Sequence, residues 1–159
     1  MPGAPTPAIA ALTKAKIPYT LRPYDHDART TAYGDEVVAA LGQDPARVFK
    51  TLVASVEGTL VVGVVPVAAH LDLKALAAAA GGKKAAMAAV AEAERSSGYV
   101  AGGISPIGQR KPLKTILDVT AGNFSTIFVS AGRRGLQVEI TATDLLAVSG
   151  GFLAAIASA

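Results

Sequence analysis

A glycine-rich loop has the clearest chemical potential in this sequence. Four glycines and one proline fall within residues 98–108, between a predicted helix and a basic segment. Glycine lets a backbone approach a ligand closely, and proline fixes the direction in which the chain continues. The bare N–H groups of such a loop can bind an anion or a carbonyl oxygen. The alternative is an ordinary glycine-rich turn that binds nothing.

Lys50 is the second candidate because it lies in an otherwise apolar run, Val-Phe-Lys-Thr-Leu-Val, over residues 48–53. Burying a lysine is costly, so its place in such a run suggests a functional role. The alternative is a position at a sheet edge, from which the amine reaches water. The sequence leaves both interpretations open.

Tyrosines and histidines are the remaining candidates. Tyr24 and Tyr33 flank a turn and could wall a pocket or stack on a base, or simply pack half-buried. His26 and His70 are the only histidines, and the chain has no cysteine. A metal site would need both histidines and nearby carboxylates, and no known ligand spacing is present, so we predict no metal and no cofactor.

Known catalytic motifs give no further candidates. The sequence contains no P-loop, no dinucleotide-binding fingerprint and no G-x-S-x-G elbow. A Ser-His-Asp triad stays open, since its members meet only in space. The lack of cysteine excludes a disulfide scaffold and a cysteine nucleophile, and it fits a reducing compartment.

Positive charge is concentrated around the glycine-rich loop. The net charge of the whole chain is +3, with 15 Lys and Arg against 12 Asp and Glu. Six of the basic residues and only one acid fall within residues 95–134. A basic patch beside such a loop favours a phosphate-bearing partner. A solvated basic face without a partner is the alternative.

Periodicity and capping residues predict an α+β fold with a mixed, partly curled sheet surrounded by helices. The two β-rich runs before and after Glu57-Gly58 predict an antiparallel hairpin. We expect no signal peptide and no membrane span. The predicted helices cover residues 7–16, 34–41, 73–80 and 86–94, a segment opened by Thr143-Asp144, and a final apolar helix. The predicted strands cover residues 19–26, 48–56, 59–67, 115–117, 125–130 and 136–140.

The chain resembles the YbaK family of Cys-tRNA(Pro) deacylases, which is related to the editing domain of bacterial prolyl-tRNA synthetases. The resemblance covers nearly the whole chain, through short motifs in a specific order: residues 6–8, 24–27, 33–38, 48–52, 66–68, 71–74, 95–99, 102–109 and 130–136. It implies that residues 1–159 form one editing domain with its site in a cleft. It also implies a cytoplasmic enzyme that deacylates mischarged tRNA.

The same resemblance assigns roles to individual positions. Lys50 matches the essential lysine of the family, and Thr51 follows it. The Gly-x-x-x-Pro loop, expected to hold the aminoacyl ester, is matched by Gly102, Gly103, Ile104, Ser105 and Pro106. Tyr24 and Tyr33 match pocket residues. Gln137 departs from the family pattern, because well-known members carry an acid there; Glu139 has the same strand parity and could lie on the same face.

The expected substrate is proline tRNA that wrongly carries cysteine, with the substrate thiol attacking its own ester. Five cations are candidates for contacting tRNA phosphates: Arg110, Lys111, Lys114, Arg133 and Arg134. Prolyl-tRNA synthetase is a second expected partner, and we expect neither DNA nor a membrane. Two alternatives stay open: an enzyme that clears alanine from proline tRNA with an activated water, and a non-catalytic RNA-binding module.

Overall fold

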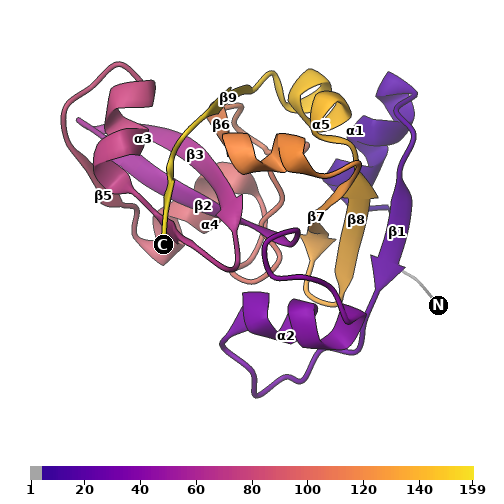
Figure 1. Cartoon of the computed structure of the whole chain (residues 1–159). Coiled ribbons are helices and arrows are strands. Elements are labelled where there is room, and N and C mark those ends of the chain that lie inside the picture. The colour runs from indigo at the N-terminus through magenta and orange to yellow at the C-terminus, as the bar shows by residue number, and fades with distance from the viewer. Residues whose placement is uncertain (1–4) are drawn as a thin grey trace.

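A computed structural model describes residues 5–159 of the chain (Figure 1). Its helices are α1 (Pro7–Ala15), α2 (Tyr33–Leu41), α3 (Leu73–Ala79), α4 (Val90–Ser97), the 3₁₀ helix η1 (Val119–Asn123) and α5 (Ala142–Ser149). Its strands are β1 (Thr20–Pro23), β2 (Phe49–Val56), β3 (Thr59–Pro66), β4 (His70–Leu71), β5 (Ala85–Met87), β6 (Lys114–Asp118), β7 (Ile127–Arg133), β8 (Leu136–Ile140), β9 (Phe152–Ala154) and β10 (Ala157–Ser158).

The larger sheet is mixed, with strand order β5-β2-β3-β6-β9. Strands β2 and β3 pair antiparallel along their whole length. Glu57 and Gly58 both have positive φ, 50° and 89°, which makes the tight turn that suits a two-residue hairpin. Strand β6 is parallel to both β3 and β9. The predicted hairpin and the α+β class are therefore confirmed.

A second sheet lies beside the first, with order β1-β8-β7 and antiparallel pairing throughout. A single parallel bridge between Val48 and Phe128 joins its β7 to the start of β2. Strands β4 and β10 form a separate antiparallel pair. In Figure 1, α2 lies below the region where the two larger sheets meet. This junction is where the candidate site forms.

The β2–β3 hairpin is buried on both faces, which explains its nearly continuous apolar sequence. Val53 and Val62 face a core shared with α1 and the second sheet. Ala54 and Val61 face a smaller core that includes Leu76 of α3. Successive strand residues point to opposite faces, so each core takes alternate positions of the hairpin.

Capping residues set several helix ends as predicted. The Thr6 hydroxyl accepts a hydrogen bond from the N–H of Ile9 at the start of α1, and the Asp72 carboxylate accepts one from Ala75 at the start of α3. Gly42, with φ 61°, ends α2. Helix α5 begins earlier than predicted, because Thr141 rather than Thr143 caps it.

Two predicted helices are wrong in part or in whole. Residues 85–87 form β5, which pairs with residues 54–56 of β2, and helix α4 begins only at Val90. The predicted final helix is absent from the described chain; its residues form β9 and β10 instead. In both places, hydrogen bonding to a strand that is distant in sequence overrides the helix propensity of alanine. Strand β1 is also shorter than predicted.

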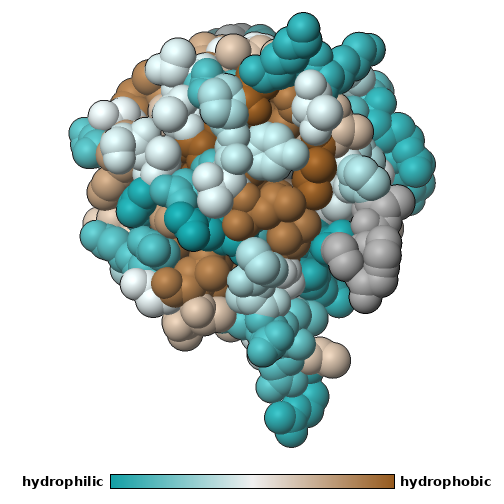
Figure 2. All heavy atoms as spheres, turned by 90° about the vertical axis from the view of Figure 1, so that its right-hand side faces the viewer, coloured by the Kyte–Doolittle hydropathy of each residue, from teal (hydrophilic) through white to brown (hydrophobic). Residues whose placement is uncertain are grey.

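One surface loop projects from the body of the fold (Figure 1). The loop between β1 and α2 projects below α2 (Figure 1) and is mostly hydrophilic (Figure 2). Its Asp27 and Arg29 are exposed and form an ion pair with each other. Within residues 5–159, no helix has the length and apolar character needed to cross a membrane.

Candidate active site

A cavity of about 310 Å³ opens at the edge of β2. It gathers six predicted site residues from four separate segments: Tyr33, Lys50, Thr51, Gly102, Ile104 and Gln137. The remaining walls are mostly apolar, formed by Gly34, Val37, Val48, Phe49, Leu52, Val67, Ala101 and Ser130. Convergent polar groups in a mainly apolar cavity are typical of a small-ligand site.

Strand β2 reaches the cavity with both of its faces because one of its edges is open there. Strand β5 pairs only with residues 54–56, so residues 49–52 have no strand neighbour on that side within the described chain. Lys50 and Thr51 are half-buried and both line the cavity, although they point to opposite faces of the strand. The lysine is therefore at a sheet edge and also in a cavity.

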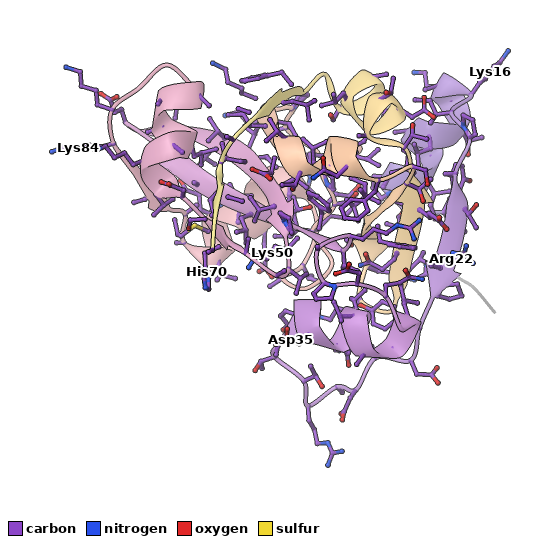
Figure 3. All side chains as sticks on the ribbon, viewed as in Figure 1. Lys16, Arg22, Asp35, Lys50, His70 and Lys84 are labelled. Atoms are coloured by element: carbon purple, nitrogen blue, oxygen red, sulfur yellow. The ribbon has the colours of Figure 1, made fainter. Side chains whose placement is uncertain are left out.

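The Lys50 amine is the cation of this cavity. It forms no ion pair with any residue of the described chain. In Figure 3, Lys50 lies in the middle of the molecule, whereas Lys16 and Lys84 point outward from its two ends. A partly buried ammonium without a carboxylate partner is suited to an anionic or carbonyl-bearing ligand.

Two residues that line the cavity each have a buried oxygen without a hydrogen-bond partner in the described chain, Oγ1 of Thr51 and Oε1 of Gln137. Gln137 is only 5% exposed. Buried polar atoms almost always have partners in folded proteins, so an unpartnered pair in one cavity points to a ligand.

Ser130 lines the cavity but was not predicted from the sequence. It lies directly opposite Gln137 in the β7–β8 pair, and its hydroxyl accepts a hydrogen bond from the N–H of Gly132. The positions of Ser130 and Gln137 on either side of the predicted turn at residues 131–135 carried the signal that could have identified it.

The glycine-rich loop forms the opposite wall and is held rigidly. The Tyr99 hydroxyl donates to the carbonyl of Ile107 at 2.7 Å, and burial raises the pKa of Tyr99 to about 12. The Glu94 carboxylate accepts from the N–H of Ala101 at 2.8 Å. Gln109 donates to the carbonyl of Ser105 at 3.0 Å. These bonds preorganise the loop before any ligand arrives.

The loop offers fewer free donors than the sequence suggested. The N–H of Gly103 donates to the carbonyl of Val100 at 2.8 Å and is not available to a ligand. The N–H groups of Gly102 and Ile104 have no protein partner in the described chain. Gly103 acts through its size instead, because a Cβ there would lie 2.7 Å from the Cα of Arg133.

Tyr33 closes one side of the cavity and is fixed by its neighbours. The guanidinium carbon of Arg134 lies 4.9 Å from the centre of the Tyr33 ring, and its Nε donates to the carbonyl of Ala101 at 2.8 Å. A Cβ on Gly102, which has φ 84°, would lie 2.7 Å from the same ring. Arg134 thus connects helix α2 to the glycine-rich loop.

A histidine–carboxylate pair holds the segment before α2 in place. His26 Nδ1 and Glu36 Oε1 are 2.7 Å apart, and the N–H of Asp27 donates to Glu36 as well. The hydrogen bond from His26 is the main reason that the pKa of Glu36 is lowered. His26 therefore helps to position the segment before α2, and it does not line the cavity.

Three further predicted residues lie outside the cavity lining. Tyr24 packs on a cluster with Val37, Val48 and Phe128. Its pKa is raised, mainly by burial. Ser105 and Pro106 are buried within the loop, where the Ser105 hydroxyl accepts from the N–H of Ile107. These three are therefore not among the residues that line this cavity.

Glu139 does not supply the acid that Gln137 lacks. It lies on the same face of β8 but is bound by Arg22 at 2.6 Å and Arg47 at 3.0 Å. A hydrogen bond from Thr126 is the main cause of its lowered pKa, and both arginines contribute. None of the described residues that line the cavity is a carboxylate or an imidazole. Within residues 5–159, no three His, Cys, Asp or Glu residues lie close enough together to bind a metal ion.

The predicted tRNA-binding cations separate into two groups. Arg134 is at the cavity, and Arg133 is beside Gly103. Lys111 and Lys114 line a second depression, at the tip of the β2–β3 hairpin, together with Glu57 and Glu92. Lys114 pairs with Val61 at the level of Ala54, about 13 Å along β2 from Lys50. Arg110 lies against Gly98 and directly precedes Lys111 in the sequence.

Comparison with known proteins identifies the family of this chain. Residues 26–148 match the model of the aminoacyl-tRNA editing domain. A protein of Enterococcus faecalis (strain ATCC 700802 / V583), named "Putative Cys-tRNA(Pro)/Cys-tRNA(Cys) deacylase EbsC", is 39% identical over 153 residues, which cover 95% of this chain and 92% of that protein.

Solved structures agree with the fold. The crystal structure of "a putative trans-editing enzyme for prolyl tRNA synthetase" has a TM-score of 0.81 and 23% identity, covering 94% of each chain. That of "hypothetical protein APE2540" has a TM-score of 0.82 and 21% identity, covering 92% of this chain and 96% of the other. Together with the sequence matches, they confirm the resemblance that the sequence motifs indicated. The chain belongs to the aminoacyl-tRNA editing domain family.

Proposed function

We propose that this protein removes cysteine from mischarged proline tRNA, with residues 1–159 acting as one editing domain in the cytoplasm. The observation that carries the proposal is the composition of the cavity: one unpaired lysine, free backbone N–H groups and no carboxylate or imidazole among the described lining residues. Such a site can place and polarise an ester, but its described lining has neither a carboxylate nor an imidazole to activate water. The name of the Enterococcus faecalis relative supports the same substrate.

The nucleophile in this mechanism is the thiol of the substrate. A free thiol has a pKa of about 8.5, so a usable fraction is thiolate near neutral pH. The thiolate sulfur attacks the carbonyl carbon of its own ester, the carbon–oxygen bond to the ribose breaks, and the leaving ribose oxygen takes a proton from water, which replaces the one that the thiol released. The products are tRNA and a cyclic thioester of cysteine, which water then opens.

The protein contributes placement and charge stabilisation. The N–H groups of Gly102 and Ile104 bind the oxygen that becomes negative during attack. The Lys50 ammonium holds the terminal phosphate or ribose of the acceptor end. The aliphatic walls around Val37 and Leu52 accept a small side chain. Editing at a separate site is needed because the synthetase site that attaches the amino acid to tRNA distinguishes small side chains by only about 1–3 kcal/mol of binding free energy.

Affinity for tRNA comes from the basic residues outside the cavity. Arg133 and Arg134 contact phosphates near the acceptor end, and Arg110, Lys111 and Lys114 contact phosphates further along the stem. Contacts of this kind carry little sequence choice and weaken with salt. We therefore infer that selectivity for proline tRNA depends on working beside prolyl-tRNA synthetase, the second partner of this proposal.

The test is single-turnover release of amino acid from Cys-tRNA(Pro) and Ala-tRNA(Pro). Wild type is expected to release cysteine, and Lys50→Ala to slow this step by about 100-fold or more. Lys14→Ala, an exposed lysine on α1, is the matched control and keeps wild-type rates. Rapid loss of alanine would contradict the thiol mechanism, because alanine has no nucleophile. Salt-sensitive binding without release of either amino acid would leave only a tRNA-binding module.

A further inference from the structure

Thr51 and Gln137 line the cavity, and each has a buried oxygen without a hydrogen-bond partner in the described chain. Gln137 is only 5% exposed, and Oγ1 of Thr51 is buried as well, whereas Lys50 is more accessible. The tRNA body must remain outside a cavity of this size, so the amino acid is the part of the substrate that enters most deeply. Under the proposed function, the group that meets Thr51 and Gln137 therefore belongs to the amino acid.

The α-amino group is the part of the amino acid that fits these two atoms. A carboxamide oxygen only accepts hydrogen bonds, and a hydroxyl can accept one too, so both can be satisfied by N–H donors. The ester carbonyl has no hydrogen to donate. A thiol is a weak donor and is better accommodated by the aliphatic walls.

Charge then decides which form of the amino group binds. When Lys50 contacts the ribose, its positive charge remains in the cavity, and no described lining residue carries a negative charge to balance it. A second cation, an α-ammonium, would be close to the first in a partly buried, low-dielectric space. An uncharged amine makes the same hydrogen bonds without this repulsion.

We propose that Gln137 and Thr51 form a subsite for the uncharged α-amine of the substrate, so that this site selects aminoacyl esters whose amino group has lost its proton. Gln137 is then the residue that determines which protonation state is bound. An acid at this position would select the ammonium instead, because a buried carboxylate pairs strongly with a cation.

The neighbouring charged groups do not change this balance. From α2, Tyr33 faces the cavity, and Glu36 behind it is bound to His26. Arg22 lies opposite Gln137 on β1 but is bound to Glu139. Two further cations at this end of the molecule, Arg133 and Arg134, add positive charge near the cavity.

The test uses hydrolysis-resistant mimics of the aminoacyl end, so that it measures binding and not release. One is adenosine carrying alanine through a 3′-amide; the other carries lactic acid, in which an uncharged hydroxyl replaces the amine. Isothermal titration calorimetry with the wild-type protein compares them at pH 6 and pH 9. An α-amino group titrates between these values. The lactyl compound reports any effect of pH on the protein itself.

We expect the wild type to bind the lactyl compound at least tenfold more tightly than the alanyl compound at pH 6, and about equally at pH 9. Gln137→Glu should reverse the preference at pH 6. Gln43→Glu, the same substitution at a position outside this cavity, should leave the preference at pH 6 unchanged. Thr51→Val should weaken the binding of both compounds.

Two outcomes would overturn the proposal and are distinguishable. Equal or tighter binding of the alanyl compound by the wild type at pH 6 would contradict the uncharged-amine subsite while leaving the proposed function intact. Binding of neither compound would also contradict the subsite, whereas the proposed function itself fails only if cysteine is not released from Cys-tRNA(Pro). The wild-type comparison needs no variant, so it stands even where Gln137→Glu does not fold.

Discussion

Gly103 illustrates how single residues determine this site. Its N–H is used within the loop, so its contribution is the absence of a side chain. A Cβ would lie 2.7 Å from the Cα of Arg133 and 2.9 Å from its carbonyl carbon, contacts that a backbone cannot relieve by rotating a side chain. The loop can pass β7 this closely only where residue 103 is glycine.

We predict that Gly103→Ala displaces the loop and lowers the free energy of unfolding by about 1–3 kcal/mol. The rate of deacylation should fall by more than the loss of folded protein explains, because a shift of about 1 Å misplaces the free N–H groups. Urea unfolding and single-turnover kinetics measure the two effects. Gly122→Ala is the control, since a Cβ there meets no atom within 4 Å. Wild-type activity in Gly103→Ala would show that the loop can move without loss of function.

At the scale of elements, the site depends on a strand that ends early and a loop that is braced. Because β5 pairs with only three residues of β2, the edge of β2 at residues 49–52 stays open for a ligand. The glycine-rich loop facing this edge is held by Tyr99, whose hydroxyl donates to the carbonyl of Ile107. Tyr99 is 4% exposed, so this hydrogen bond has no competing water.

Tyr99→Phe is expected to lower the free energy of unfolding by about 1–2 kcal/mol, because the carbonyl of Ile107 stays buried without its donor. Thermal or urea unfolding provides the measurement. The matched variant Tyr19→Phe, at a half-buried tyrosine outside the loop, should change stability by less than about 0.5 kcal/mol. Equal effects of the two substitutions would argue against a bracing role for the Tyr99 hydroxyl.

At the scale of the whole molecule, Asp118 ties β10 and the residue before it to the larger sheet. Its Oδ1 accepts hydrogen bonds from the N–H groups of Ile156 and Ala157, both at 2.9 Å, and Oδ2 accepts from Thr120. Burial alone would raise the pKa of this carboxyl, but the hydrogen bonds from Thr120, Ile156 and Ala157 hold it below its ordinary value. The charged form is thus favoured by folding.

The resulting stability depends on pH with a definite sign. A carboxyl whose pKa is lower in the folded state adds its full contribution to the free energy of unfolding above its unfolded pKa of about 3.9. This contribution is lost as the pH falls below that value. Asp118→Asn should therefore cost about 2 kcal/mol at pH 7 and less at pH 3. Urea unfolding at both pH values tests this, with the exposed Asp25→Asn as control. A cost that does not change with pH would contradict a role for the charge.

Much of this protein is determined by local sequence. The hairpin around Glu57-Gly58, the helix starts at Thr6 and Asp72, and the glycine stop at Gly42 follow from turn and capping chemistry that involves only neighbouring residues. These predictions were confirmed because their physical causes span only a few residues. Short motifs in the sequence also single out Lys50 and the glycine-rich loop, and the fold places both at one cavity.

Other features were decided by tertiary structure alone. Residues 85–87 and the C-terminal segment form strands because partners far away in sequence, at β2, β6 and β4, offer hydrogen bonds that outweigh alanine's helix propensity. The placement of Tyr24 behind the cavity, the facing positions of Ser130 and Gln137, and the separation of the cations also depend on long-range packing. A cavity and its free donors are properties of several segments at once, so only the folded chain determines which residues meet there.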